Sequence, residues 1–161
     1  MSDDVLKIVP ADSAHVPPAE THQLAVLTLE ALLPDGEMCH AQAYDKIEFI
    51  DCGENLEAII CPVCATRTAL DYFSEVNPGM QLWEQINDRL EDTPPSEAII
   101  QMSCCSAAVP LTALKFDWPV AFSQFELSIY NPNVSDNLSP DDLSQLEAIL
   151  GCKLVQVRAH Y

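Results

Sequence analysis

Seven cysteines are the residues of this chain with the clearest potential for chemistry. Four lie in two close pairs and three stand alone. They are Cys39, Cys52, Cys61, Cys64, Cys104, Cys105 and Cys152. The first residues, Met1-Ser2-Asp3-Asp4, lack the basic and apolar regions of a secretory signal, so we expect a cytoplasmic protein with reduced thiols. Because an odd number of cysteines cannot pair completely, the thiols indicate metal binding or redox chemistry rather than a disulfide scaffold.

The spacing of the paired cysteines predicts a structural zinc site. In Cys61-Pro62-Val63-Cys64, a turn between the two cysteines can aim both sulfurs at one ion. Structural zinc takes four ligands in a tetrahedron and binds cysteine as the thiolate. We therefore predict that Cys61, Cys64, Cys104 and Cys105 hold one Zn²⁺. We predict no catalytic residue and no organic cofactor.

Two features of this ligand set stay open at the level of sequence. Neighbouring residues of an extended strand point to opposite faces, so Cys104 and Cys105 reach the same ion only if the chain turns there. Otherwise one of them belongs to the core, and Cys39 or His40 is the candidate replacement ligand. A hairpin is predicted between residues 46–51 and 56–60, with Cys52 at its turn, far from Cys61. Cys52 is therefore interpreted as lying outside the site.

The turn Cys61-Pro62-Val63-Cys64 resembles the knuckle of zinc ribbons and rubredoxin-like sites. The resemblance covers these four residues. Ala65 stands where such knuckles usually have glycine, and the adjacent pair Cys104-Cys105 stands in place of a second knuckle. The resemblance implies a metal held by four thiolates.

The elements that must position the cysteine pairs are predicted from hydrophobic patterns. Residues 56–60 and 98–103 are predicted to be strands, and residues 66–90 to be helical with an interruption at 77–79. This β-α-β order predicts a crossover between parallel strands. The crossover would place the C-terminal ends of both strands, and therefore both cysteine pairs, at the same edge of one sheet.

The remaining patterns predict a single α+β domain. Further strands are expected over 5–9, 46–51, 111–116, 120–130 and 153–159, and further helices over 20–33 and 139–150. The helix over 20–33 is apolar on all sides, which is typical of a buried helix. With no internal repeat or linker recognised, we predict one domain over residues 1–161, with a mixed β-sheet and three to four helices.

The charge of the chain argues against several kinds of partner. Twenty-five acidic residues against seven basic ones give a net charge of −18, and no two basic residues are neighbours. Proteins that bind nucleic acid cluster their basic residues, and membrane spans need about 18 or more consecutive apolar residues. We therefore expect neither nucleic acid nor membrane as partner. A basic protein suits the negative field, although the charge could also serve solubility alone.

These observations favour a non-enzymatic protein of the bacterial cytoplasm. Its four-thiolate zinc would stabilise a domain that docks or neutralises a basic protein, since such an ion has no open position for water or substrate. The alternative is a thioredoxin-like thiol oxidoreductase using Cys61 and Cys64. It follows from the predicted order of strand, C-x-x-C and helix, in which a helix N-terminus lowers the pKa of the first thiol.

Overall fold

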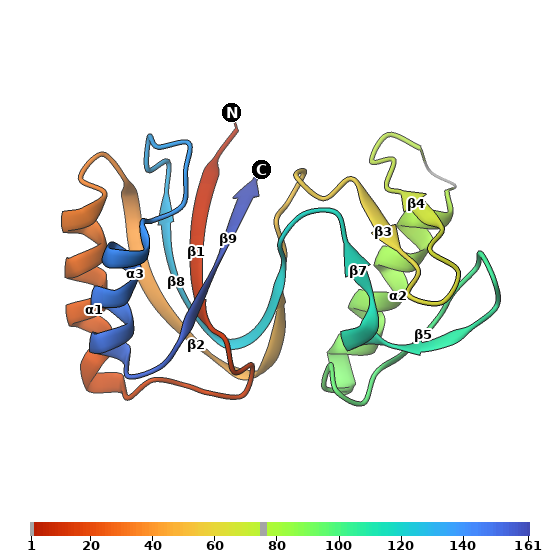
Figure 1. Ribbon diagram of the computed structural model, residues 1–161, viewed down its shortest axis with the longest axis horizontal. Helices are drawn as coiled ribbons and strands as arrows, with labels where there is room; N and C mark the ends of the chain where they lie inside the picture. Colours follow the sequence, from red (N-terminus) through yellow and green to blue (C-terminus); the bar gives the residue numbers. More distant parts are fainter. Residues whose placement is uncertain (1, 75–76) are drawn as a thin grey trace. The chain divides into compact units, whose positions relative to one another are not determined.

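The computed structural model describes residues 2–74 and 77–161 (Figure 1). The chain divides into two compact units. The first comprises Met1–Asn55 and Pro119–Tyr161, and the second, Leu56–Trp118, is inserted between these two segments. That both units belong to one cooperative domain over residues 1–161 stays a prediction.

The first unit is a four-stranded antiparallel sheet with two helices on one face (Figure 1). Its elements are β1 (Asp4–Pro10), α1 (Ala19–Leu32), β2 (Glu37–Ile50), β8 (Ala121–Tyr130), α3 (Pro140–Leu150) and β9 (Leu154–His160). The strands lie in the order β2-β8-β1-β9. Strand β8 therefore separates β1 from β2, which gives the unit the split β-α-β topology of ferredoxin-like folds.

The core of this unit lies between the sheet and its helices. In β8, Phe125, Leu127 and Ile129 are fully buried on one face, as the alternating pattern predicts. They pack with Leu29 of α1 and Leu146 of α3. The prediction that the first helix is buried on all sides is wrong, because only one of its faces meets this core. On the opposite face, the side chains of Leu24 and Leu27 are 56% and 52% exposed.

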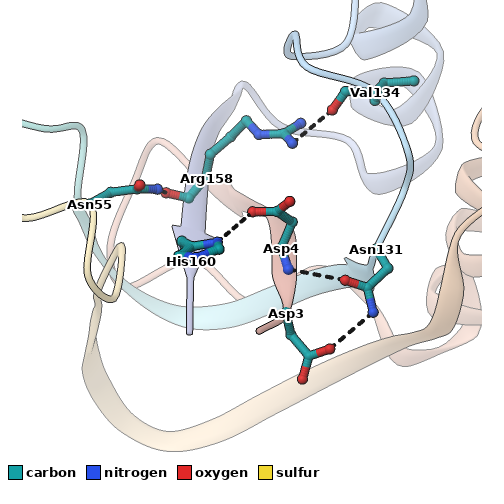
Figure 2. Close-up of polar contacts among 7 residues, drawn as sticks. All are labelled: Asp3, Asp4, Asn55, Asn131, Val134, Arg158 and His160. Atoms are coloured by element: carbon teal, nitrogen blue, oxygen red, sulfur yellow. Dashed lines mark hydrogen bonds and ion pairs between the residues drawn. The ribbon is translucent and has the colours of Figure 1, made fainter. Parts of the chain in front are cut away.

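Polar contacts fasten the ends of the sheet strands (Figure 2). The imidazole of His160 pairs with the carboxylate of Asp4 at 2.8 Å, across the β1–β9 ladder. The side chain of Asn131 accepts a hydrogen bond from the backbone N–H of Asp4 at 3.0 Å. The amide of Asn55 donates to the carbonyl of Arg158 at 3.0 Å. The last residue before the inserted unit is therefore held against β9.

The second unit consists of short strands and one helix. Its elements are β3 (Ala58–Ile60), β4 (Arg67–Ala69), α2 (Pro78–Asp92), β5 (Ile99–Gln101), β6 (Ala108–Pro110), the 3₁₀ turn Leu111–Ala113 and β7 (Lys115–Phe116). Strands β4-β3-β7 form one sheet, and β5 and β6 form a separate hairpin. Helix α2 starts close to β4, where a Cβ on Gly79 would overlap the carbonyl oxygen of Ala69.

The predicted parallel β-α-β crossover is wrong, and so is the mixed sheet that contained it. Among the described residues, every pairing between named strands is antiparallel. The chain reverses directly after Cys64, and residues 67–69 pair back onto β3 instead of starting a helix. So short a connection joins only antiparallel strands. The helix begins at Pro78, where the side chain of Asn77 caps it.

The hairpin predicted between residues 46–51 and 56–60 is not formed either. Residues 46–50 belong to the long strand β2, which pairs with β8, whereas β3 pairs with β4 and β7. Among the helices described, none has both the length and the apolar character that a membrane span requires.

Candidate metal centre

The first cysteine pair lies in the turn of the β3–β4 hairpin. The backbone N–H of Cys61 donates to the carbonyl of Thr66 at 3.0 Å, and the N–H of Ala65 donates to the carbonyl of Cys61 at 3.0 Å. Ala65 has a φ of 63°, in the left-handed region where knuckles usually carry glycine. The N–H of Val63 donates to the sulfur of Cys61 at 3.4 Å. This tight reversal brings the sulfurs of Cys61 and Cys64 together.

The second pair lies in the turn of the β5–β6 hairpin, which is built in the same way. The backbone N–H of Met102 donates to the carbonyl of Ala107 at 2.8 Å, and Ser106 has a left-handed φ of 60°. Residues 103–105 form the turn itself. The condition set by the sequence, that the chain turns at Cys104 and Cys105, is therefore met.

The two hairpins correspond with a shift of 41 residues along the chain. This shift relates β3 to β5 and β4 to β6. It relates Cys61 to Met102 by their equivalent hydrogen bonds, and Ala65 to Ser106 by their left-handed backbone. The expectation of a chain without an internal repeat is therefore wrong, because the structure contains two equivalent hairpins.

The correspondence shows how the second turn departs from a C-x-x-C knuckle. Cys105 occupies the position of Cys64, but the position of Cys61 is taken by Met102, whose side chain is 1% exposed. Cys104 stands where the first turn has Val63. The tetrapeptide Glu-Ala-Ile-Ile occurs at residues 57–60 and again at 97–100, ahead of each cysteine pair. These copies are 40 residues apart, so the repeat in the sequence is one residue out of register with the structural correspondence.

The four sulfur atoms of Cys61, Cys64, Cys104 and Cys105 form a compact group. All of them lie within 4.8 Å of one another. The Cys64–Cys104 sulfur distance is 3.4 Å and the Cys61–Cys105 distance is 3.8 Å. Zinc–sulfur bonds of about 2.3 Å in a tetrahedron place sulfurs about 3.8 Å apart, whereas a disulfide needs about 2 Å. The group therefore has the dimensions of a four-thiolate metal site and consists of free thiols.

The two turns give their thiols different acidities. The backbone N–H groups of Cys64 and Val63 lower the pKa of Cys61, and the hydroxyl of Thr66, 3.1 Å away, lowers the pKa of Cys64 to about 6. The hydrogen bond with Cys64 raises the pKa of Cys104 to about 12. Without a cation, ionisation therefore starts on the first turn. A divalent metal favours the thiolate form of all four groups.

Access to the group is uneven. Cys61 is buried, whereas Cys64, Cys104 and Cys105 are exposed. A metal held here would be anchored on the buried side by Cys61 and reached by solvent molecules on the side of the other three. Large reagents such as chelators can therefore approach the site without unfolding the unit.

The other candidate ligands do not belong to this group. Cys39 and His40 lie on β2 of the first unit, where the thiol of Cys39 is 3.7 Å from the carbonyl oxygen of Val26. Burial raises the pKa of Cys39 to about 12. Cys52 is fully buried in the same unit, and Cys152 follows α3. The group of four is complete without a replacement ligand.

The arrangement on which the thiol oxidoreductase alternative rests is not formed. It requires a helix directly after Cys64, whose N-terminus would stabilise the thiolate of Cys61. Strand β4 occupies that place, and the local hydrogen bonds to sulfur come from the turn itself.

Comparison with known proteins finds no family model, no curated protein and no solved structure that matches this chain.

Proposed function

We propose that this protein is a non-enzymatic binding module whose inserted unit is stabilised by a structural zinc ion on Cys61, Cys64, Cys104 and Cys105. The observation that carries the proposal is the meeting of four thiol sulfurs from two separate hairpin turns, in which Cys64 and Cys104 are 40 residues apart in the chain. Soft thiolates in a four-fold set select zinc over calcium or magnesium, which prefer oxygen ligands.

The inserted unit has the features of a small module that needs a metal. It spans only Leu56–Trp118, and domains below about 70 residues rarely gain enough stability from a hydrophobic core alone. Its strands have three residues or fewer. In small zinc modules the ion contributes apparent free energies of about 10–16 kcal/mol, and this energy is folding energy. Zinc would join the two hairpins and so replace part of a core.

The ligand set also supports a non-enzymatic role. Four thiolates fill the coordination sphere of zinc, so no position is left for a reacting water or substrate. The chemistry that the ion supplies is structural. The residues of the turns contribute the ligands and the N–H groups that hold them.

The charge of the chain supports a basic protein as partner. The net charge is −18, and several of the seven basic residues are engaged within the protein. Arg67 pairs with Asp117 at 2.9 Å, and Lys7 is 8% exposed with its ammonium hydrogen-bonded. The excess of carboxylates is therefore directed to solvent, where it attracts cationic surfaces. Free thiols fit a reducing compartment, which makes the cytoplasm the proposed location.

The metal part of the proposal is tested by elemental analysis of the full chain, purified from cells without added metal. We expect about one zinc per chain. Cys64→Ser should lose most of it, and Cys152→Ser, which removes a thiol outside the group, should keep it. Zinc-free protein that is folded, or equal zinc loss in both variants, would contradict the assignment.

The partner part of the proposal needs a separate measurement. We expect the zinc-loaded chain to bind a basic model protein such as a histone-like polypeptide, with an affinity that falls as salt rises from 50 to 300 mM, because exposed charges are screened over about 10 Å at 0.1 M salt. Binding that does not depend on salt would show that charge does not choose the partner.

A further inference from the structure

The sheet of the first unit has a cavity on the face opposite its core. Side chains alternate along strands, so Lys7 on β1 and Glu126 and Tyr130 on β8 face away from the core residues of those strands. The cavity has a volume of about 340 Å³. It is lined, among others, by Lys7, Tyr44, Glu48, Glu126, Tyr130 and Tyr161. A volume of this size accommodates one amino-acid side chain.

The cavity already holds an ammonium group, that of Lys7. The side chain of Lys7 is 8% exposed, and its Nζ donates to the phenol oxygen of Tyr161 at 2.7 Å and to the carbonyl oxygen of Asp51 at 3.0 Å. The same Nζ lies 5.2 Å from the centroid of the Tyr161 ring. The phenol of Tyr161 donates in turn to the carboxylate of Asp51 at 2.7 Å. The phenol oxygen of Tyr161 and the carbonyl oxygen of Asp51 replace part of the water around this buried cation.

The cavity contains a second phenol–carboxylate pair. The phenol of Tyr44 donates to the carboxylate of Glu126 at 3.2 Å. Tyr130 is stacked on His40, with ring centroids 6.4 Å apart and an angle of 22°. Glu48 lines the same space.

The two phenols that hydrogen-bond to carboxylates in the cavity, those of Tyr44 and Tyr161, keep their protons. Burial, followed by the charge of Glu126, raises the pKa of Tyr44 above its usual range. Burial and the hydrogen bond to Asp51 do the same for Tyr161. Both rings are therefore neutral at physiological pH, and their hydroxyl groups act as hydrogen-bond donors to the carboxylates. The carboxylates of Glu48, Asp51 and Glu126 outnumber the single ammonium of Lys7, so the cavity is negative.

We propose that this cavity binds the cationic side chain of a lysine or arginine on the partner protein, an inference that rests on the proposed function, in which that partner is basic. The ammonium or guanidinium group would lie against the rings of Tyr44 and Tyr130 and pair with Glu126. Cations over aromatic faces gain most when a carboxylate is close and water is partly excluded. An anionic ligand is disfavoured by the three carboxylates.

The test is a titration of the ¹⁵N-labelled full chain, followed by NMR, with arginine amide and lysine amide as probes. We expect saturable shifts centred on Tyr44, Glu126 and Tyr130. Glu126→Gln keeps the shape of the side chain but removes its charge, and should weaken the probe about tenfold, which corresponds to about 1.4 kcal/mol. Tyr44→Phe, which removes only a hydroxyl, is the second variant. Glu20→Gln is the matched control, because it removes one exposed carboxylate from α1, which packs on the core face.

Four results would overturn the proposal. They are the absence of saturable shifts, equal weakening by Glu126→Gln and Glu20→Gln, tighter binding of glutamate than of arginine amide, and binding of spermidine without binding of either amide. The last result would identify a free polyamine rather than a protein side chain as the ligand. Zinc content measured on the same samples separates this inference from the metal assignment, since each readout can fail while the other holds.

Discussion

Moving one cysteine ligand from position 104 to position 102 tests the structure of the metal centre in most detail. The shift of 41 residues relates Met102 to Cys61, so a thiol at position 102 would turn the second hairpin into a C-x-x-C knuckle with Cys105. Cys104→Ser removes one of four ligands. Loss of a residue that only hydrogen-bonds to a metal ligand already lowers metal affinity about 10–100-fold. Loss of a ligand itself should therefore lower the affinity for zinc by at least about a hundredfold. The double variant Met102→Cys/Cys104→Ser should recover affinity to within about tenfold of the unaltered chain.

The assay is competition for zinc against a chromophoric chelator at fixed pH. Affinity is the readout because Met102 is 1% exposed, and shortening its side chain is expected to cost about 1–3 kcal/mol of stability whatever the metal does. Met102→Cys alone is the control for that packing cost. If Cys104→Ser binds zinc as well as the unaltered chain, Cys104 is not a ligand. If the double variant binds no better than Cys104→Ser, the proposed correspondence of the two turns is wrong.

Three further predictions concern stability. Removal of zinc by a chelator should abolish the protection of backbone amides from hydrogen exchange in β3–β6. Strands β1 and β8 should keep their protection, because the first unit has its own core. Loss of protection in both units together would indicate a single cooperative domain. Ser139→Ala should lower the midpoint of thermal unfolding by about 2–4 °C. The Ser139 hydroxyl accepts a hydrogen bond from the N–H of Asp142 at 3.2 Å, and such a helix cap contributes about 1 kcal/mol to the free energy of unfolding. An unchanged midpoint would show that the cap does not contribute to stability. Gly79→Ala should destabilise the second unit by about 1–3 kcal/mol, because its Cβ would overlap the carbonyl oxygen of Ala69; unaltered zinc retention in a chelator challenge would argue against this close approach.

Local signals in the sequence identify most elements of the first unit. Ser139 and Pro140 predict the start of the last helix, and α3 begins at Pro140 with Ser139 as its cap. The alternation of Phe125, Leu127 and Ile129 predicts both strand β8 and its buried face. These signals are reliable because capping and strand alternation depend on neighbouring residues.

The topology could not be predicted in the same way. The pattern around Leu70 and Phe73 resembles a helix, yet residues 67–69 form a strand and the side chain of Phe73 is fully exposed. Three-residue strands show too few alternations to be distinguished from other structures. The pairing of β2 with β8 joins segments that are separated by the whole inserted unit, and no local pattern specifies it.

The cysteine group was predicted correctly as a cluster, but from the wrong topology. The sequence argument brought the pairs together at one edge of a parallel sheet, whereas each pair lies in the turn of its own antiparallel hairpin. The number of ligands that structural zinc takes was a separate argument for proximity, and that argument does not depend on how the strands are connected. The sequence did not predict that Met102 occupies the position equivalent to Cys61, nor that the two turns are equivalent. A methionine at this position gives no indication of a cysteine-type turn.

X-ray absorption at the zinc edge of the purified full chain tests the central claim most directly, because it reports the number and kind of atoms bound to the ion. The proposed site predicts four sulfur neighbours at about 2.3 Å and no nitrogen or oxygen in the first shell. A first shell containing nitrogen or oxygen, or fewer than four sulfurs, would contradict a closed structural centre built from Cys61, Cys64, Cys104 and Cys105.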